Sequence, residues 1–121
     1  NGSQDGTAEY LRTLPGATVI VNPDNRGFAA AVNQGIQAAR GAQILLLNND
    51  TLVTTGWLRR MLEAISSAVD IGLVGPVSNN VSGEQQVEVG YGGLAELDGW
   101  AWDWSRDHAG QTVDTDRLVG F

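Results

Sequence analysis

Three short runs of apolar residues occur along the first 76 positions of the chain. They show no polar alternation, and each is bounded by glycine, proline or asparagine, which is typical of strands buried on both faces. The runs are 17–21 (ATVIV), 43–48 (QILLLN) and 71–76 (IGLVGP).

Around these runs, apolar residues recur every three or four positions, which predicts amphipathic helices. The clearest helices are expected at 27–40 and at 55–68. A shorter helix at about 8–14 is expected to begin with Thr7 as its cap, and residues 94–105 form a fourth candidate.

The order strand, helix, strand, helix, strand predicts two βαβ units. We therefore expect an α/β fold with a partly parallel, Rossmann-like sheet that is covered on both faces. The chain is expected to form a single domain, 1–121, in which residues 1–76 carry the βαβαβ part. Residues 77–121 are expected to begin a second part of the same domain.

Composition narrows the possible functions. The 121 residues include seven arginines, no lysine, fourteen acids and no cysteine, and the net charge is −7. We therefore expect no nucleic-acid partner, and the sequence excludes disulfides and cysteine-metal sites. Because it contains no long apolar run and no basic-then-apolar leader, we expect a soluble segment.

Three polar clusters fall where a parallel sheet would bind a ligand, at the carboxyl ends of its strands. They are residues 1–7 (NGSQDGT), 22–28 (NPDNRGF) and 48–51 (NNDT). The helix that opens at Gly27 offers backbone N–H groups to an anionic ligand, and Asp50 is a candidate ligand of a hard divalent cation. Taken singly, each cluster is better explained by ordinary turns and caps, such as an Asx turn at Asp50 or a cap at Asn25, than by a ligand site.

Together, at this spacing, the motifs resemble the family 2 glycosyltransferases of the GT-A fold, and most closely the rhamnosyltransferase-like enzymes of bacterial cell-surface polysaccharide synthesis. The likeness rests on NGSQDGT, VNPDNRGFAAAVNQGI, ILLLNNDT, GWLRRMLEA and IGLVGPVSN; it runs from Asn1 to about Asn80 and resumes at RLVGF, 117–121, which is expected to open a strand. It implies transfer of a sugar from a UDP- or dTDP-sugar to a saccharide acceptor, in the cytoplasm or at the inner face of the membrane.

The resemblance also implies roles for individual positions. Ser3 and Asp5 are expected near the base and ribose of the donor. Further nucleoside contacts are implied for Asn25, Gly27, Phe28 and Asn33. Asp50 matches the last acid of the family's Asp-x-Asp motif and is expected to bind Mn²⁺ or Mg²⁺, whereas Asn48 replaces the first acid.

An inverting transferase also needs a carboxylate base, and the resemblance places this base beyond Phe121 and a further strand ahead of Asn1. We therefore expect a chain truncated at both ends and inactive by itself. The alternative is a non-catalytic α/β module that acts in binding or self-assembly. Exposed sheet edges predict a homo-oligomer in either case. A dinucleotide-binding oxidoreductase is disfavoured because no G-x-G-x-x-G follows a strand.

Aromatic residues near the end of the chain allow two interpretations. Tryptophans at positions 100, 102 and 104 are suited to stacking on a sugar acceptor. Trp100 and Trp104 lie four positions apart, however, and this spacing favours packing of one helix face onto the domain. His108 has no evident catalytic partner and is expected on the surface.

Overall fold

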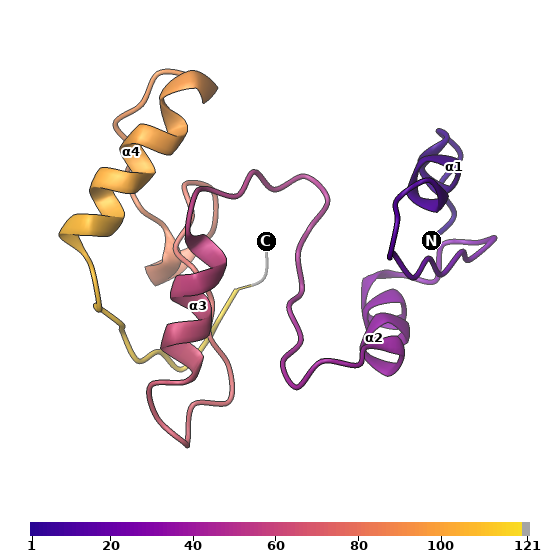
Figure 1. The fold of residues 1–121 in the computed structure, drawn as a ribbon, viewed down its shortest axis with the longest axis horizontal. Coiled ribbons are helices and arrows are strands. Elements are labelled where there is room, and N and C mark those ends of the chain that lie inside the picture. Colours follow the sequence, from indigo (N-terminus) through magenta and orange to yellow (C-terminus); the bar gives the residue numbers. More distant parts are fainter. Residues whose placement is uncertain (120–121) are drawn as a thin grey trace. The chain divides into compact units, whose positions relative to one another are not determined.

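The computed structural model describes residues 1–119 and divides into two compact units, unit 1 (Asn1–Leu46) and unit 2 (Leu47–Phe121). Unit 1 contains two helices, α1 (Thr7–Arg12) and α2 (Phe28–Ala38) (Figure 1). Unit 2 contains α3 (Trp57–Ile65), the short 3-10 helix η1 (Gly83–Gln85) and α4 (Leu94–Asp107). The predicted subdivision at residues 76 and 77 stays a prediction.

The four α-helices form where the apolar periodicity predicted them. Helices α2 and α3 lie inside the ranges 27–40 and 55–68, and α4 covers 94–105 and continues for two further residues. Glycines with positive φ precede the first three helices, at positions 6, 27 and 56. Because glycine adopts such angles without steric cost, these positions set where each helix begins.

The predicted sheet is absent from residues 1–119. The runs 17–21, 43–48 and 71–76 form no strands, and the isolated bridge of the described residues joins Ser78 to Gln86. The prediction of a partly parallel α/β sheet of βαβ units with a Rossmann-like GT-A fold was therefore wrong. An apolar run indicates a strand only if neighbouring strands satisfy its backbone groups, and the sequence pattern carries no information about that pairing.

The lack of pairing leaves the apolar runs accessible to solvent. Leu46 is 56% exposed and Leu47 is 51% exposed. Within the described part of the chain, Ala101 of α4 is the one buried hydrophobic residue. The expectation of a homo-oligomer through sheet edges loses its structural basis, because these residues present no sheet edge.

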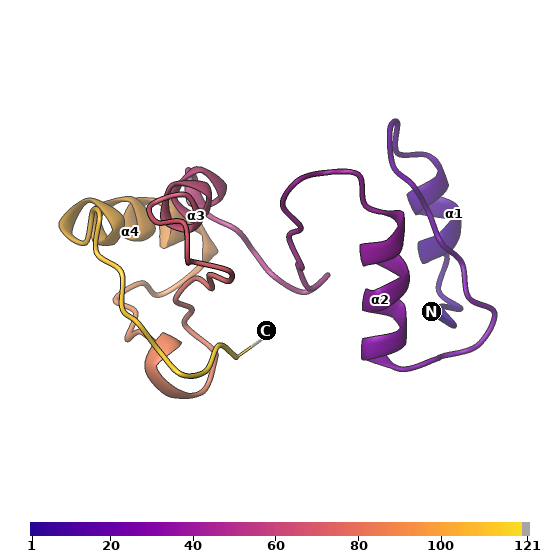
Figure 2. The same ribbon diagram turned by 90° about the horizontal axis from the view of Figure 1, so that it is seen from below.

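Polar side chains make hydrogen bonds between distant segments of unit 2. Gln85 is buried; its Nε2 donates to the carbonyl of Pro76 at 2.9 Å, and its Oε1 accepts from the N–H of Val119 at 2.6 Å. On α4, Asp98 Oδ1 accepts from the N–H of Thr55 at 3.1 Å, which ties this helix to the segment just before α3. The ribbon shows α3 and α4 side by side (Figure 2). The predicted strand at 117–121 extends into residues 120 and 121, which lie outside the described residues. Across the described residues, no helix is both long enough and apolar enough to cross a bilayer.

Candidate functional site

Unit 1 brings two of the three polar clusters together through the side chain of Asn1. Its Oδ1 accepts from the N–H of Arg26 at 3.0 Å and from Asn22 Nδ2 at 3.3 Å. Its Nδ2 donates to Asn25 Oδ1 at 2.9 Å and to the carbonyl of Gly27 at 3.2 Å. In both ribbon views the N-terminus lies beside α2 (Figures 1 and 2). A single amide, with its two donors and two acceptor sites, thus fastens loop 1–7 to loop 22–27.

A pair of side-chain amides, Asn22 and Gln34, connects loop 22–27 to α2. Asn22 is buried, and its Nδ2 donates to Gln34 Oε1 on α2 at 2.7 Å. Gln34 Nε2 donates back to Asn22 Oδ1 at 3.2 Å. A buried side-chain amide needs such partners, because leaving its polar atoms unpaired away from water is costly.

Gly2 allows the two loops to approach each other at the backbone. Its N–H donates to the carbonyl of Asn22 at 2.9 Å, and its φ is 75°. A Cβ at this position would lie 2.9 Å from the backbone nitrogen of Asn25. Glycine is therefore required here both by the left-handed conformation and by the space available.

The start of α1 is organised by Asp5. Its Oδ1 accepts from the hydroxyl of Thr7 at 2.6 Å and from the N–H of Thr7 at 3.2 Å. Gly6 occupies the cap position and Thr7 is the first residue of the helix, so the prediction of Thr7 as the cap was wrong. The hydrogen bond from the Thr7 hydroxyl, followed by the one from its backbone N–H, holds the pKa of Asp5 below its ordinary value.

Thr7→Val should raise the pKa of Asp5 toward its ordinary value, because valine keeps the branched shape but removes the hydroxyl donor. A lowered pKa in the folded chain means that this carboxylate stabilises the fold above its unfolded-state pKa and ceases to do so as pH falls through the folded value. Carbon-detected NMR titration of the Asp5 carboxyl measures the change. Thr13→Val is the control, because the Thr13 hydroxyl donates to the Tyr10 carbonyl instead. An Asp5 titration curve unchanged by Thr7→Val would contradict this assignment.

The start of α2 presents the other predicted nucleoside-binding residues. Asn25 Oδ1 accepts from the N–H of Gly27 at 2.9 Å and so makes a local turn, but Gly27 occupies the cap position of α2, so the alternative of a cap at Asn25 was wrong. Gly27 has φ 81° and ψ 166°, a combination open essentially only to glycine. Phe28 is 71% exposed on the first turn of α2, and Asn33 is exposed further along the same helix.

A small hollow in unit 1 lies beside the joined loops. Its polar side is formed by Asn1, Ser3 and Thr7, and its apolar side by residues of α1 and of the run 17–21. The apolar lining consists of Ala8, Leu11, Val19, Ile20 and Val21. Of the predicted nucleoside-binding residues, the hollow includes Ser3.

Asp50 lies in unit 2, in an exposed turn at residues 49 and 50. Its carboxylate takes no part in the hydrogen bonds and ion pairs formed among residues 1–119, and Gly56 is the cap of α3. The alternative that Asp50 makes an Asx turn or a helix cap is thus not supported. The same residues contain no group of three or more acids or histidines able to enclose a metal. One free carboxylate does fit a cation that takes its other ligands from phosphates and water.

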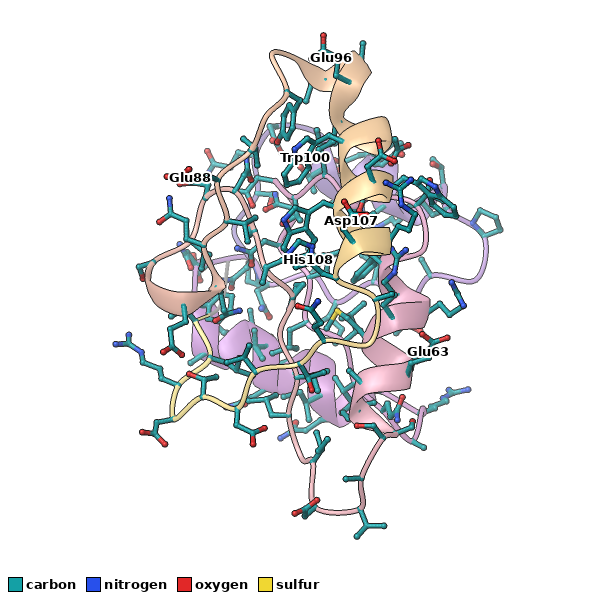
Figure 3. The ribbon with its side chains drawn as sticks, turned by 90° about the vertical axis from the view of Figure 1, so that its left-hand side faces the viewer. Glu63, Glu88, Glu96, Trp100, Asp107 and His108 are labelled. Atoms are coloured by element: carbon teal, nitrogen blue, oxygen red, sulfur yellow. The ribbon has the colours of Figure 1, made fainter. Side chains whose placement is uncertain are left out.

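The aromatic residues of α4 stack on one another. The ring centroids of Trp100 and Trp104 are 6.3 Å apart, those of Trp104 and His108 are 3.9 Å apart, and Tyr91 and Trp100 meet in a T-shaped arrangement. Trp100 and His108 project from the same side of α4 (Figure 3). The rings of Trp100 and Trp104 lie on one face of α4, while the predicted packing of that face onto the domain stays a prediction; His108 is exposed, as expected. The His108 ring covers one face of Trp104, whereas Trp102 is 53% exposed.

Comparison with known proteins decides the class of this chain. The model of the family described as glycosyl transferase family 2 matches residues 1–96. The chain belongs to glycosyl transferase family 2. The matched region of this family 2 chain contains the joined loops of unit 1 and the turn that carries Asp50. The assignment to family 2 is therefore confirmed, although the sheet expected with it is not seen.

Two curated relatives of this family 2 chain cover its first part. It is 35% identical over 79 residues to glycosyltransferase AglE of Haloferax volcanii, a match of 62% of this chain and 26% of that protein. It is 40% identical over 68 residues to the succinoglycan biosynthesis protein ExoO of Rhizobium meliloti, a match of 54% of this chain and 20% of that protein. The chain thus spans about a quarter or less of the relatives it matches. No solved structure matches it.

Sequence reasoning missed the residues that hold the site of this family 2 chain together. Asn1, Asn22 and Gln34 were not singled out, although they make the contacts between the two loops and α2. One feature of the sequence could have indicated these contacts: Asn22 is a polar residue directly between an apolar run and Pro23. Its partners lie 12 and 21 positions away, and no local pattern identifies them.

Proposed function

We propose that this family 2 chain takes part in transferring a sugar from a nucleotide-diphosphate donor to a saccharide acceptor during polysaccharide synthesis. The observation that carries the proposal is the joining of loops 1–7 and 22–27 by Asn1, within the region matched by the family. Family membership supports the reaction class. The relatives' names, a glycosyltransferase and a succinoglycan biosynthesis protein, support the setting.

The joined loops are suited to the nucleoside and diphosphate of the donor. Ser3 and Asp5 offer exposed polar groups, and the exposed ring of Phe28 offers a stacking surface for a base. The N-terminus of α2, a helix of 11 residues, favours negative charge. With a net charge of −7, the chain must hold an anionic donor through such local groups, among them the exposed Arg26 next to Asn1.

For the cation, we assign Asp50 as the protein ligand of Mn²⁺ or Mg²⁺. A divalent cation would stabilise the negative charge that develops on the leaving diphosphate. The contribution of the chain is a carboxylate that is exposed and has no structural partner in the described residues. Asn48 supplies an amide where a second acid would add charge, so we expect weaker metal binding than at a two-acid site.

Finer parts of the proposal rest on the motif resemblance alone. They are a rhamnosyltransferase-like preference for a UDP- or dTDP-sugar, and a reaction at the cytoplasmic face of the membrane. The non-catalytic alternative predicts donor binding without turnover, which separates it from the transferase by experiment.

Calorimetry on the full-length protein tests the proposal. UDP or dTDP should bind with Kd between about 1 µM and 1 mM in the presence of Mn²⁺ or Mg²⁺, and more weakly after chelation of the metal. ADP serves as the matched control for the base. If neither UDP nor dTDP binds, the proposal is wrong. Binding without release of UDP or dTDP from sugar donors, across a panel of saccharide acceptors, would favour the non-catalytic alternative.

A further inference from the structure

The pairing of Asn22 with Gln34 connects the two ends of the segment proposed to bind the donor. Asn22 is the last residue before the turn 23–27, and Gln34 lies two turns into α2. Their amides are joined by two hydrogen bonds of opposite direction, 2.7 and 3.2 Å long. The segment between them contains Asn25, Gly27 and Phe28, so the pair fixes the stretch on which the proposed nucleoside contacts lie.

The same pair is also connected to loop 1–7 by hydrogen bonds of Asn22. Asn22 Nδ2 is shared between Gln34 and Asn1, and the carbonyl of Asn22 accepts from the N–H of Gly2. Asn1 in turn holds the N–H of Arg26. Loss of the pair would release Asn22, and the contacts of loop 1–7 with loop 22–27 would loosen with it. Neither Asn22 nor Gln34 is among the proposed donor contacts.

We propose that Asn22 and Gln34 form an amide latch that sets the spacing of the two donor-binding loops and so controls donor affinity. This inference rests on the proposed function, because it concerns the same loops. Asn22 and Gln34 act as positioning residues: they hold Asn1, Asn25 and the start of α2 in place and do not touch the donor. The latch is uncharged, so its effect does not depend on pH near neutrality.

The main test is Gln34→Met in the full-length protein, which keeps the side-chain length and removes both hydrogen bonds. The Kd for UDP and the KM for the nucleotide-sugar should rise about tenfold, because net loss of one or two part-buried hydrogen bonds has that size. The kcat should stay within about twofold, since the latch acts on donor affinity. Gln37→Met on the exposed part of the same helix is the matched control and should change neither constant.

Two further variants keep the test decisive. The double variant Asn22→Gln/Gln34→Asn swaps the two residues, so that one glutamine and one asparagine side chain still face each other. It should recover most of the UDP affinity lost in Gln34→Met. Gln34→Glu, a milder change, keeps the acceptor for Asn22 Nδ2 but loses the donor to Asn22 Oδ1, and should weaken UDP binding by an intermediate factor. If Gln34→Met fails to fold, UDP binding is compared between the unaltered protein, Gln34→Glu and the double variant. Unchanged UDP binding in Gln34→Glu would overturn the latch.

Hydrogen exchange without nucleotide separates this inference from the proposed function. In Gln34→Met or Gln34→Glu, the N–H of Arg26, which Asn1 holds, should exchange faster than in the unaltered protein. If the unaltered protein binds neither UDP nor dTDP, the proposed function fails. The hydrogen-exchange rates measured without nucleotide then still show whether the latch orders the loops. If it binds UDP and Gln34→Met binds equally well, the latch is refuted and the proposed function stands.

Discussion

Asp50→Ala in the full-length protein should lower kcat/KM for sugar transfer by about 10²–10³, the usual size of removing one electrostatic contribution to a transition state. Asp50 is exposed and makes no hydrogen bond or ion pair within residues 1–119, so its removal should leave folding stability almost unchanged. The loss should be accompanied by loss of metal-dependent UDP binding. Initial rates measured over a titration of Mn²⁺, with calorimetry of UDP at each end of the titration, give both quantities.

The control for this prediction is Asp70→Ala, which removes another exposed carboxylate of unit 2, after α3. Asp70→Ala changes the net charge by the same amount as Asp50→Ala, so an effect of net charge alone would appear in both variants. Equal metal dependence of Asp50→Ala and the unaltered protein would remove Asp50 from the mechanism.

Gly27→Ala should both destabilise the fold and weaken donor binding. Gly27 has φ 81° and ψ 166°, and a side chain in this region is strained by about 1–3 kcal/mol. No atom crowds the Cβ position, so the cost comes from the backbone alone. If the backbone of the variant changes its φ and ψ to relieve the strain, the start of α2 must move. The hydrogen bonds of Gly27 with Asn1 and Asn25 lie at this point. Urea unfolding measures the stability, and calorimetry with UDP should show affinity reduced by about tenfold or more.

Gly35→Ala is the matched control on the same helix. Gly35 lies inside α2 without positive φ, and an added Cβ would meet nothing within 4 Å. Alanine is favoured over glycine there by about 0.5–1 kcal/mol, so this variant should be more stable and should bind UDP as before. Stability of Gly27→Ala equal to that of Gly35→Ala would contradict the backbone argument.

The sequence allowed the helices to be predicted because their signals are local. Apolar spacing of three to four residues describes one face of a helix, and glycines at positions 6, 27 and 56 stop the chain from continuing the preceding conformation. The helix limits were displaced by only a few residues, most clearly where Thr7 was expected as a cap and Gly6 takes that place. Such shifts reflect fine turn geometry that a pattern of residue types does not resolve.

The sheet was predicted wrongly because strands depend on partners. The run at 43–48 has the composition of a buried strand, yet a parallel strand forms only through hydrogen bonds to neighbouring strands. In the described residues those neighbours do not pair with it, and Leu45 to Leu47 are 43–56% exposed. The grouping of polar loops was inferred from that sheet. In the structure, loops 1–7 and 22–27 are joined instead by side-chain amides.

The amide contacts themselves were beyond prediction from one sequence. Asn1, Asn22 and Gln34 are separated by up to 33 positions, and amides of this kind most often face solvent. Only the folded chain shows that Asn22 is buried and that its two partners converge on it. The predicted roles of Ser3, Phe28 and Asn33 in donor binding, in contrast, come from the family resemblance and stay predictions.

Hydrogen–deuterium exchange of the full-length protein with and without UDP and Mn²⁺ tests most directly whether loops 1–7 and 22–28 form one donor site. UDP should slow exchange in peptides that cover both loops together, because backbone N–H groups at the start of α2 and around Asn1 become shielded. Peptides that cover α3, residues 57–65, serve as the internal reference and should be unaffected. Protection that leaves both loops unchanged and appears elsewhere in the protein would contradict the assignment of the donor site.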